Sequence, residues 1–143
     1  LILQSILMIS FLKIALAEQY SLTIFSNHTI DIVKTNKEKK FSISKAIGSW
    51  QDSLGNYGSS LILFYIDAIF NKDGSVRGLA ELTNQFGSKV WFAPSRSDNL
   101  KDAGVGKMVA IEAENDYKFL LDKKCTYAIK YIEERSFIKV ICK

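Results

Sequence analysis

Apolar and polar residues alternate along much of this chain with a period of two, which is the spacing of a half-buried β-strand. Residues 41–50 begin with a clean alternation, whereas no long segment shows the 3.6-residue period of an amphipathic helix. Turn-forming residues separate the apolar segments at intervals of roughly ten residues. The strands predicted in this way span residues 20–26, 29–33, 41–50, 60–70, 75–84, 89–93, 105–112, 125–132 and 135–142.

The connections between these segments point to one fold class. Residues 27–28, 53–58, 71–74 and 85–87 are predicted turns, Pro94 is expected to end its strand, and 115–123 is a short helical or irregular link. About eight short strands joined by tight turns predict an all-β domain. We favour a small antiparallel up-and-down barrel over a β-sandwich, because hairpins join successive strands and a closed barrel leaves no exposed edge.

The segment 60–70 is apolar at both odd and even positions, which is typical of a central strand with both faces covered. A hairpin loop of even length at residues 73–74 would place Asp67 on the same face as Tyr65 and Val76. We therefore expect Asp67 to point into the barrel. A buried carboxylate is costly without a partner, so Asp67 should hold an internal hydrogen bond or serve a ligand or proton transfer.

The two cysteines, Cys125 and Cys142, lie in the last two predicted strands. If Glu133 and Glu134 form the turn, positions whose numbers add up to 267 lie opposite each other, and the cysteines face one another. A four-residue loop would keep the same faces and shift the pairs by two. We expect a disulfide with Cα atoms about 4.4–6.8 Å apart, rather than a metal site, which would need nearby histidines.

Residues 1–17 are almost wholly apolar and end in Ala15-Leu16-Ala17, the small-x-small pattern that a signal peptidase recognises. The run is shorter than the roughly 20 residues needed to span a bilayer. We expect cleavage after Ala17, a single domain over 18–143 in the periplasm or outside the cell, and no stable membrane insertion afterwards. A retained N-terminal anchor or a buried helix is the alternative.

Composition narrows the classes of function. The net charge is +4, and three of the 19 basic residues are arginine (Arg77, Arg96 and Arg135). This argues against nucleic-acid binding, because phosphate and guanine are preferentially bound by arginine. No phosphate loop, dinucleotide fingerprint or zinc spacing occurs, so we expect no cofactor and no metal. His28 lies between turn-like residues without the spacing of a catalytic triad, and we expect it to be structural or exposed.

Two short motifs and one basic residue of this chain resemble conserved sequence features of a known family, the lipocalins. Gly48-Ser49-Trp50 resembles the Gly-x-Trp signature of those proteins, Asn115-Asp116-Tyr117 is similar to their Thr-Asp-Tyr loop, and Arg135 is similar to their late basic residue. The resemblance implies a calycin-like barrel and no catalytic residue.

A second resemblance covers residues 48–60, 84–91, 96–107 and 117–127. These segments resemble an uncharacterised family of small exported bacterial β-barrel proteins, which are themselves similar to allene-oxide-cyclase-like barrels. The shared features are a Gly-Thr-Gly-x-Tyr turn, which here is residues 113–117 without either glycine, and a Cys-x-Tyr strand, which here is 125–127. This resemblance also implies a calycin-like barrel and no known activity.

A barrel of this size either has a filled interior or holds one small ligand. A filled interior predicts a non-catalytic structural or protein-interaction module, and a hollow one predicts binding of a small apolar or amphipathic ligand. An interior volume above roughly 300 Å³ would favour the ligand. A cofactor-free isomerase that uses Asp67 and a tyrosine is a further alternative, although we expect a non-enzymatic role. The candidate ligand-binding residues are Asp67, Tyr65, Trp50 and Tyr127.

Overall fold

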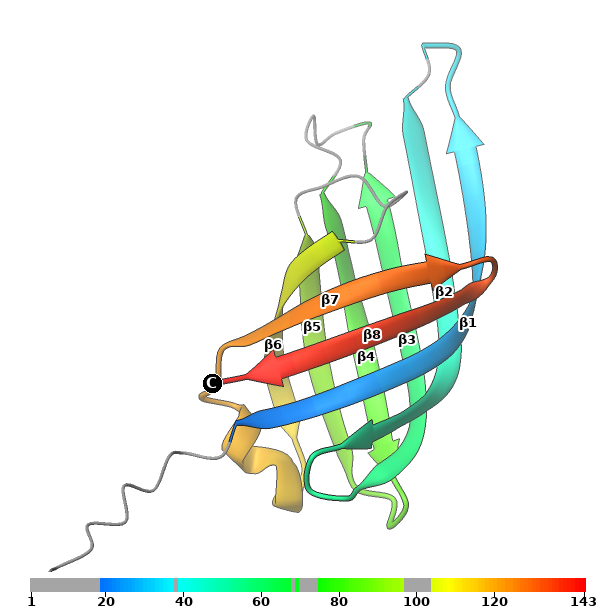
Figure 1. Ribbon diagram of the computed structural model, residues 1–143. Helices are drawn as coiled ribbons and strands as arrows, with labels where there is room; N and C mark the ends of the chain where they lie inside the picture. Colours follow the sequence, from blue (N-terminus) through cyan, green and yellow to red (C-terminus); the bar gives the residue numbers. More distant parts are fainter. Residues whose placement is uncertain (1–18, 38, 68, 70–74, 97–103) are drawn as a thin grey trace, which may run out of the picture.

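A computed structural model describes residues 19–37, 39–67, 69, 75–96 and 104–143. Eight antiparallel strands form a closed barrel, in which each strand pairs with the next and β8 pairs with β1 (Figure 1). The predicted all-β barrel is therefore confirmed. The elements are β1 (Tyr20–Lys34), β2 (Lys40–Asp52), β3 (Tyr57–Asp67), β4 (Val76–Asn84), β5 (Lys89–Arg96), β6 (Gly104–Ala113), the 3₁₀ helix η1 (Asn115–Leu120), β7 (Cys125–Ile132) and β8 (Arg135–Cys142).

The barrel is flattened into two layers that cross at a steep angle. In Figure 1, β7, β8 and the first part of β1 pass in front of β3, β4 and β5. The neighbouring strands β1 and β2 approach each other closely at Gly48, where a side chain would overlap the carbonyl group of Phe25. The glycine of the Gly-Ser-Trp motif is therefore required by backbone packing.

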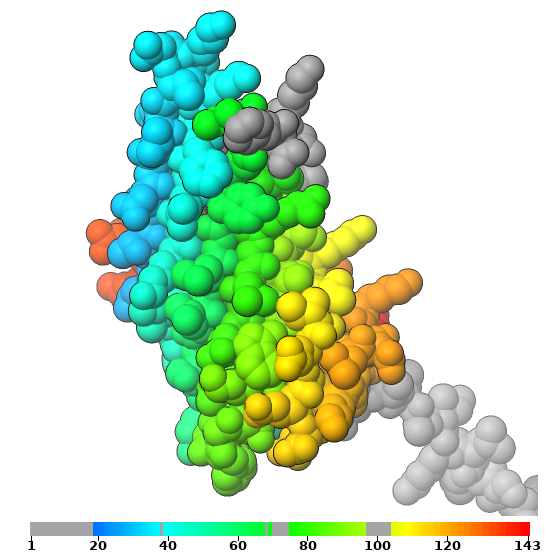
Figure 2. All heavy atoms as spheres, turned by 180° about the vertical axis from the view of Figure 1, so that it is seen from behind, coloured from blue at the N-terminus to red at the C-terminus, as the bar shows by residue number. Residues whose placement is uncertain are grey.

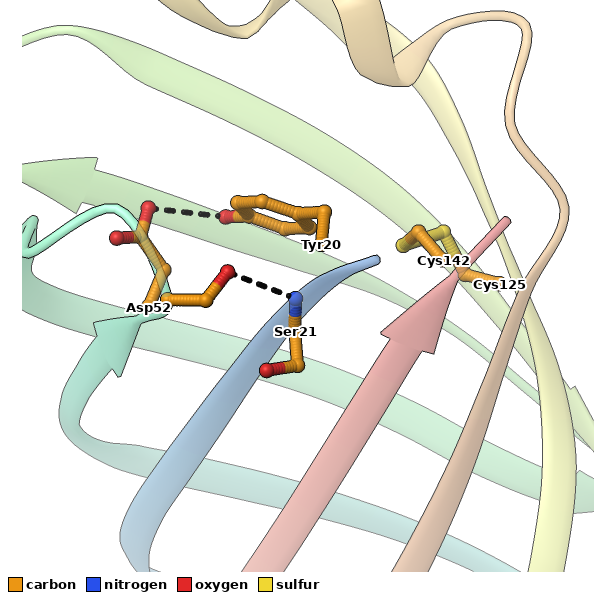
Figure 3. The surroundings of a disulfide bond; sticks show 6 residues. Tyr20, Ser21, Asp52, Cys125 and Cys142 are labelled. Carbon is orange, nitrogen blue, oxygen red and sulfur yellow. Dashed lines mark hydrogen bonds between the residues drawn. A yellow bond between two sulfur atoms is a disulfide. The ribbon is translucent and has the colours of Figure 1, made fainter. Parts of the chain in front are cut away.

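The terminal hairpin has the predicted register. Cys125 pairs with Cys142, Tyr127 with Val140 and Ile129 with Ile138, all with buried side chains. The cysteines form a disulfide whose Cα atoms are 4.0 Å apart, slightly closer than expected (Figure 3). The turn has two residues, and Glu133 has the positive φ of 55° that such turns demand of their first central residue.

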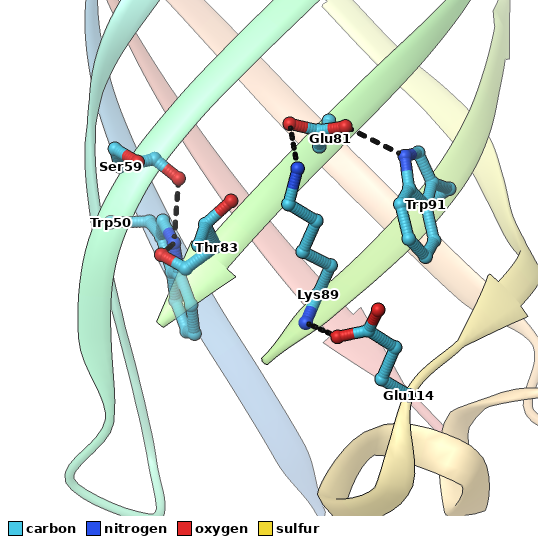
Figure 4. A network of polar contacts seen from close by, with 7 residues as sticks. All are labelled: Trp50, Ser59, Glu81, Thr83, Lys89, Trp91 and Glu114. Atoms are coloured by element: carbon cyan, nitrogen blue, oxygen red, sulfur yellow. Dashed lines mark hydrogen bonds and ion pairs between the residues drawn. The ribbon is translucent and has the colours of Figure 1, made fainter. Parts of the chain in front are cut away.

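Helix η1 and an aromatic cluster close the lower end of the barrel. The link predicted at 115–123 forms this helix, and its Tyr117 and Leu120 are buried. The ring of Trp50 packs edge-on against Tyr117, with centroids 6.1 Å apart. Trp50 Nε1 donates to the carbonyl oxygens of Ser59 and Thr83 at 3.0 and 3.1 Å (Figure 4). These contacts tie η1, β2, β3 and β4 into one filled layer.

Asp52 organises the β2–β3 turn beside this layer. Its Oδ1 accepts hydrogen bonds from the backbone N–H groups of Leu54 and Asn56 at 2.9 and 2.8 Å. Its Oδ2 accepts the phenol hydrogen of Tyr20 at 3.1 Å (Figure 3). Burial, and after it the charge of Asp52, raises the pKa of Tyr20 well above the ordinary value of a phenol. Tyr20 therefore stays neutral and anchors the start of β1 to the turn.

The orientation predicted for β3 was wrong. Ile66 pairs with Val76, so the nine residues 67–75 separate the two partners, an odd number where an even one was assumed. A shift of one residue moves every side chain of a strand to the opposite face. Leu61, Leu63 and Tyr65 consequently lie exposed on the outside, so β3 does not have both faces covered by this chain's described residues. The predicted turn at 71–74 lies outside those residues.

Two predicted strand ends were also wrong. Residues 27–28 continue β1 instead of turning, because His28 pairs with Ala46 of β2 and Asn27 with Ile47. Strand β5 runs past Pro94 to Arg96. Pro94 is tolerated because it pairs with Met108 on the β6 side, whereas the β4–β5 ladder skips residues 78 and 79 opposite it.

Candidate functional site

The upper half of the barrel, where β3 and β5 end and β4 and β6 begin, contains a cavity of about 40 Å³. A water-sized group needs about 10–15 Å³ on this measure, so the cavity has room for roughly three. It is far smaller than the roughly 300 Å³ that would favour a large ligand. The lining residues are Ile62, Phe64, Val76, Pro94, Arg96, Met108, Tyr127, Ile129, Tyr131 and Ile138.

Arg96 is the one charged residue among the ten described residues that line this cavity. It is the last residue of β5, and its side chain is 5% exposed. A side chain at Gly104, which begins β6, would overlap the guanidinium group of Arg96. The missing side chain at Gly104 therefore makes the space in which the buried guanidinium lies.

Two tyrosines line the cavity together with Arg96, and His28 packs against one of them. Tyr127 occupies space left by Gly106, its partner on β6, where a side chain would overlap the phenol ring. Burial raises the pKa of Tyr131, while the positive charge of Arg96 partly opposes that rise. The ring of His28 packs edge-on against Tyr131 with centroids 5.2 Å apart. His28 Nδ1 is buried and has no hydrogen-bond partner within the described part of the chain.

The four predicted ligand-binding residues are not brought together. Tyr127 lines the cavity, and Trp50 lies in the filled layer at the opposite end. Tyr65 is on the outer surface, 41% exposed, and its ring stacks on Phe41 at 6.4 Å between centroids. Asp67 lies on the same outward-facing side of β3 as Tyr65 and is half-buried. Its Oδ1 accepts a hydrogen bond from the backbone N–H of Ile69 at 3.0 Å. The prediction that Asp67 points into the barrel was wrong, because it relied on the incorrect β3–β4 register.

Arg96, Tyr131 and His28 were not among the site residues predicted from the sequence. Arg96 was left outside the predicted strand because Pro94 was expected to end it, although Arg96 shares the even parity of the buried Phe92. Similarly, His28 was placed in a turn, although it continues the even, inward-facing parity of Leu22 and Ile24. In both cases the signal was continued alternation across a residue that usually ends a strand.

A separate polar network lies on the outside of β4 and β5. Glu81 accepts hydrogen bonds from Lys89 Nζ at 3.0 Å and from Trp91 Nε1 at 2.9 Å, while Glu114 accepts the backbone N–H of Lys89 (Figure 4). The hydrogen bonds from Lys89 and Trp91 hold the pKa of Glu81 below its ordinary value. Glu81 is therefore ionised at neutral pH. The network offers no enclosed space for a ligand.

The described ranges contain neither a cluster of metal ligands nor a helix that could cross a membrane. No three His, Cys, Asp or Glu side chains there are grouped to hold a metal ion. Helices long and apolar enough to cross a membrane are also absent from those ranges.

The barrel is similar to solved structures, although no protein-family model and no curated protein matches the chain. A protein of unknown function from Clostridium acetobutylicum is 12% identical, with a TM-score of 0.61 over 87% of this chain and 95% of that one. A conserved protein of unknown function from Rhodopseudomonas palustris is 10% identical, with a TM-score of 0.65 over 87% and 96%. A β-barrel-like protein from Acinetobacter baumannii is 9% identical, with a TM-score of 0.61 over 86% and 91%. At these identities the likeness shows the fold alone.

Proposed function

We propose that this chain is an exported, non-enzymatic barrel that binds one small amphipathic anion in its upper cavity. The acid group of the ligand contacts Arg96, and its apolar part contacts the surrounding aliphatic side chains. The observation that carries the proposal is a buried arginine in the wall of a cavity whose other described lining residues are uncharged.

The chemistry of Arg96 favours a carboxylate. The planar fork of N–H donors on its guanidinium matches the two oxygens of a carboxylate, and charge-assisted hydrogen bonds of this kind are about twice as strong as neutral ones. The raised pKa of Tyr131 keeps its phenol protonated at neutral pH, so the hydroxyl can donate to the same anion.

The volume of the cavity sets the size of the ligand. About 40 Å³ accommodates three or four heavy atoms, which is the size of acetate or of part of propionate. Ile62, Met108 and Ile138 would then contact the methyl group. The lower half of the barrel is filled by Trp50 and Tyr117, so a long-chain lipid does not fit the described interior. A relation to calycin-like barrels, whose interiors can hold a ligand, agrees with this proposal.

Binding is tested by ligand-observed NMR with propionate and with propionamide, its neutral analogue of nearly equal shape. We expect propionate to bind with a millimolar or tighter dissociation constant, since a ligand of five heavy atoms has a limited maximal affinity. Propionamide should bind at least about tenfold more weakly, because it lacks the charge. Arg96→Met should remove the difference between the two ligands.

Two further variants separate binding from folding. Ile138→Phe should fill the cavity and abolish propionate binding while leaving Arg96 in place. Arg77→Met, which removes an exposed arginine from the outer face of β4, should bind like the parent protein. Absence of propionate binding at about 50 mM, or equal binding of the amide, would contradict the proposal.

Export is the second part of the proposal. The disulfide indicates an oxidising compartment, because such bonds are rare in the cytosol. We propose that residues 1–17 are a signal peptide and that the mature domain is 18–143. Mass spectrometry of the protein from its native cells should give an N-terminus at Glu18. An N-terminus before Glu18 would show that the segment is retained.

A further inference from the structure

The outer surface of β2, β3 and β4 is unusually apolar for a water-exposed sheet. Six large aliphatic or aromatic side chains on it are between 37% and 55% exposed: Ile43, Ile47, Leu61, Leu63, Tyr65 and Leu79. We call this surface the β2–β4 face, and Figure 2 views the molecule from the side of these strands. Contiguous apolar patches on soluble proteins commonly mark surfaces that bind another protein.

The strand register arranges this face in three rows. The first row runs across the strands as Ile43, Tyr65 and Arg77. The middle row is Lys45, Leu63 and Leu79, and the third is Ile47, Leu61 and Glu81. The rows are about 7 Å apart, because outward-facing residues recur at every second position of a strand. Arg77 and Glu81 therefore occupy the same end of the two outer rows, with opposite charges.

We propose that a second copy of this chain packs on the β2–β4 face, related to the first by a two-fold axis along the middle row. This axis places the first row of one copy over the third row of the other. Arg77 then faces Glu81 of the second copy, and the same pair forms again by symmetry. Tyr65 lies over Leu61, Ile43 lies over Ile47, and Leu63 meets its own counterpart.

The shape of the face agrees with this arrangement. A groove of about 490 Å³ lies along the first row and is lined by Phe41, Ile43, Leu63, Phe64, Tyr65, Arg77, Gly78 and Leu79. Ile47 and Leu61 lie in the third row and are 55% and 37% exposed. The two-fold axis brings these side chains of each copy over the groove of the other. The two ion pairs would thus form together with these apolar contacts.

The charges select this axis over the other simple one. A two-fold axis along β3 would instead put Ile43 against Arg77 and Ile47 against Glu81, which desolvates each charge without a partner. Glu81 is already ionised, since Lys89 and Trp91 lower its pKa, so it can accept a further cation at the rim. The middle-row axis also places Lys45 near its own counterpart. The long stem of lysine lets each ammonium reach water, so this contact weakens the dimer without blocking it.

The dimer is tested by reversing the charges of the Arg77–Glu81 pair between the two copies. The molecular mass is measured by sedimentation velocity on the protein recovered after export. The parent chain should dimerise. Arg77→Glu and Glu81→Arg should each weaken the dimer at least about tenfold, because each sets like charges opposite one another. The double variant R77E/E81R should restore the dissociation constant to within about threefold of the parent value. Lys45→Gln should lower the dissociation constant of the dimer.

A control and a second variant keep the test decisive. Lys107→Glu changes an exposed charge on β6, away from the face, and should leave the dimer unchanged. Leu63→Asp should give a monomer with an unchanged near-ultraviolet dichroism spectrum. A parent chain that stays monomeric at about 0.5 mM overturns the proposal, and so does a double variant that stays as weak as the singles. None of these substitutions touches the upper cavity, so the outcome is independent of anion binding.

Discussion

Trp50→Ala is expected to lower the free energy of unfolding by about 3–5 kcal/mol, which is the usual range for removing a large buried aromatic side chain. Trp50 is 2% exposed and contacts Tyr117 of η1, so its loss would leave a cavity against the closing helix. The carbonyl oxygens of Ser59 and Thr83 would also lose its indole donor. Urea unfolding followed by circular dichroism at several protein concentrations measures the change.

The second tryptophan provides a matched control. Trp91 lies half-buried on the outer face of β5, where its indole donates to Glu81. Trp91→Ala should cost only about 1 kcal/mol, because the side chain is partly solvated and leaves no enclosed cavity. Trp50→Phe should cost about 1–2 kcal/mol, since it keeps one ring against Tyr117 and removes the N–H donor and part of the buried volume. Equal effects of the two alanine substitutions would contradict the role of Trp50 in closing the barrel.

Removing the disulfide is expected to cost about 3 kcal/mol in the double variant C125A/C142A. The two cysteines are 17 residues apart, and closing a loop of that size restricts the unfolded chain by about this amount in the chain-entropy model. The bond also lies beside the shortest ladder of the barrel, since β6 and β7 pair only over residues 104–108 and 125–129. We therefore expect faster hydrogen exchange at the β6–β7 seam of the variant.

A reductant distinguishes the covalent bond from the packing of the two side chains. Dithiothreitol should lower the urea midpoint of the parent protein and have no effect on C125A/C142A. A parent midpoint that is insensitive to reductant, with the thiols shown to be free, would mean that the disulfide adds no stability. The hairpin register alone would then hold β7 and β8 together.

Much of the fold could be predicted because local signals agreed with each other. In the terminal hairpin, the alternation of Tyr127, Ile129, Ile138 and Val140 selected one face, and the cysteines fixed the same register. The link at η1 was also predicted, as were the number of strands and the closed barrel. Neighbouring strands supply the information for the hairpins, whereas closure of the barrel pairs β1 with β8, more than 100 residues apart in the chain.

The candidate site could not be predicted in the same way. Arg96, Tyr131 and His28 come from β5, β7 and β1, and nothing in their spacing along the chain indicates that they meet. Tyr65 and Asp67 were proposed instead because β3 is apolar on both parities, which left its orientation dependent on the length of one loop. The upper cavity is therefore a product of strand register and of the small residues Gly104 and Gly106.

By itself, the sequence determined the all-β class, the succession of hairpins and the disulfide, since a period of two and well-marked turns encode them locally, and it favoured a barrel over a sandwich. The tertiary structure alone decided which face of β3 is buried and which polar side chains share the interior. Leu61 and Leu63 are as apolar as Ile62 and Phe64, so hydrophobicity could not orient that strand. Its pairing with β4 and the closure of the barrel oriented it, because a one-residue change of register reverses every side chain at once.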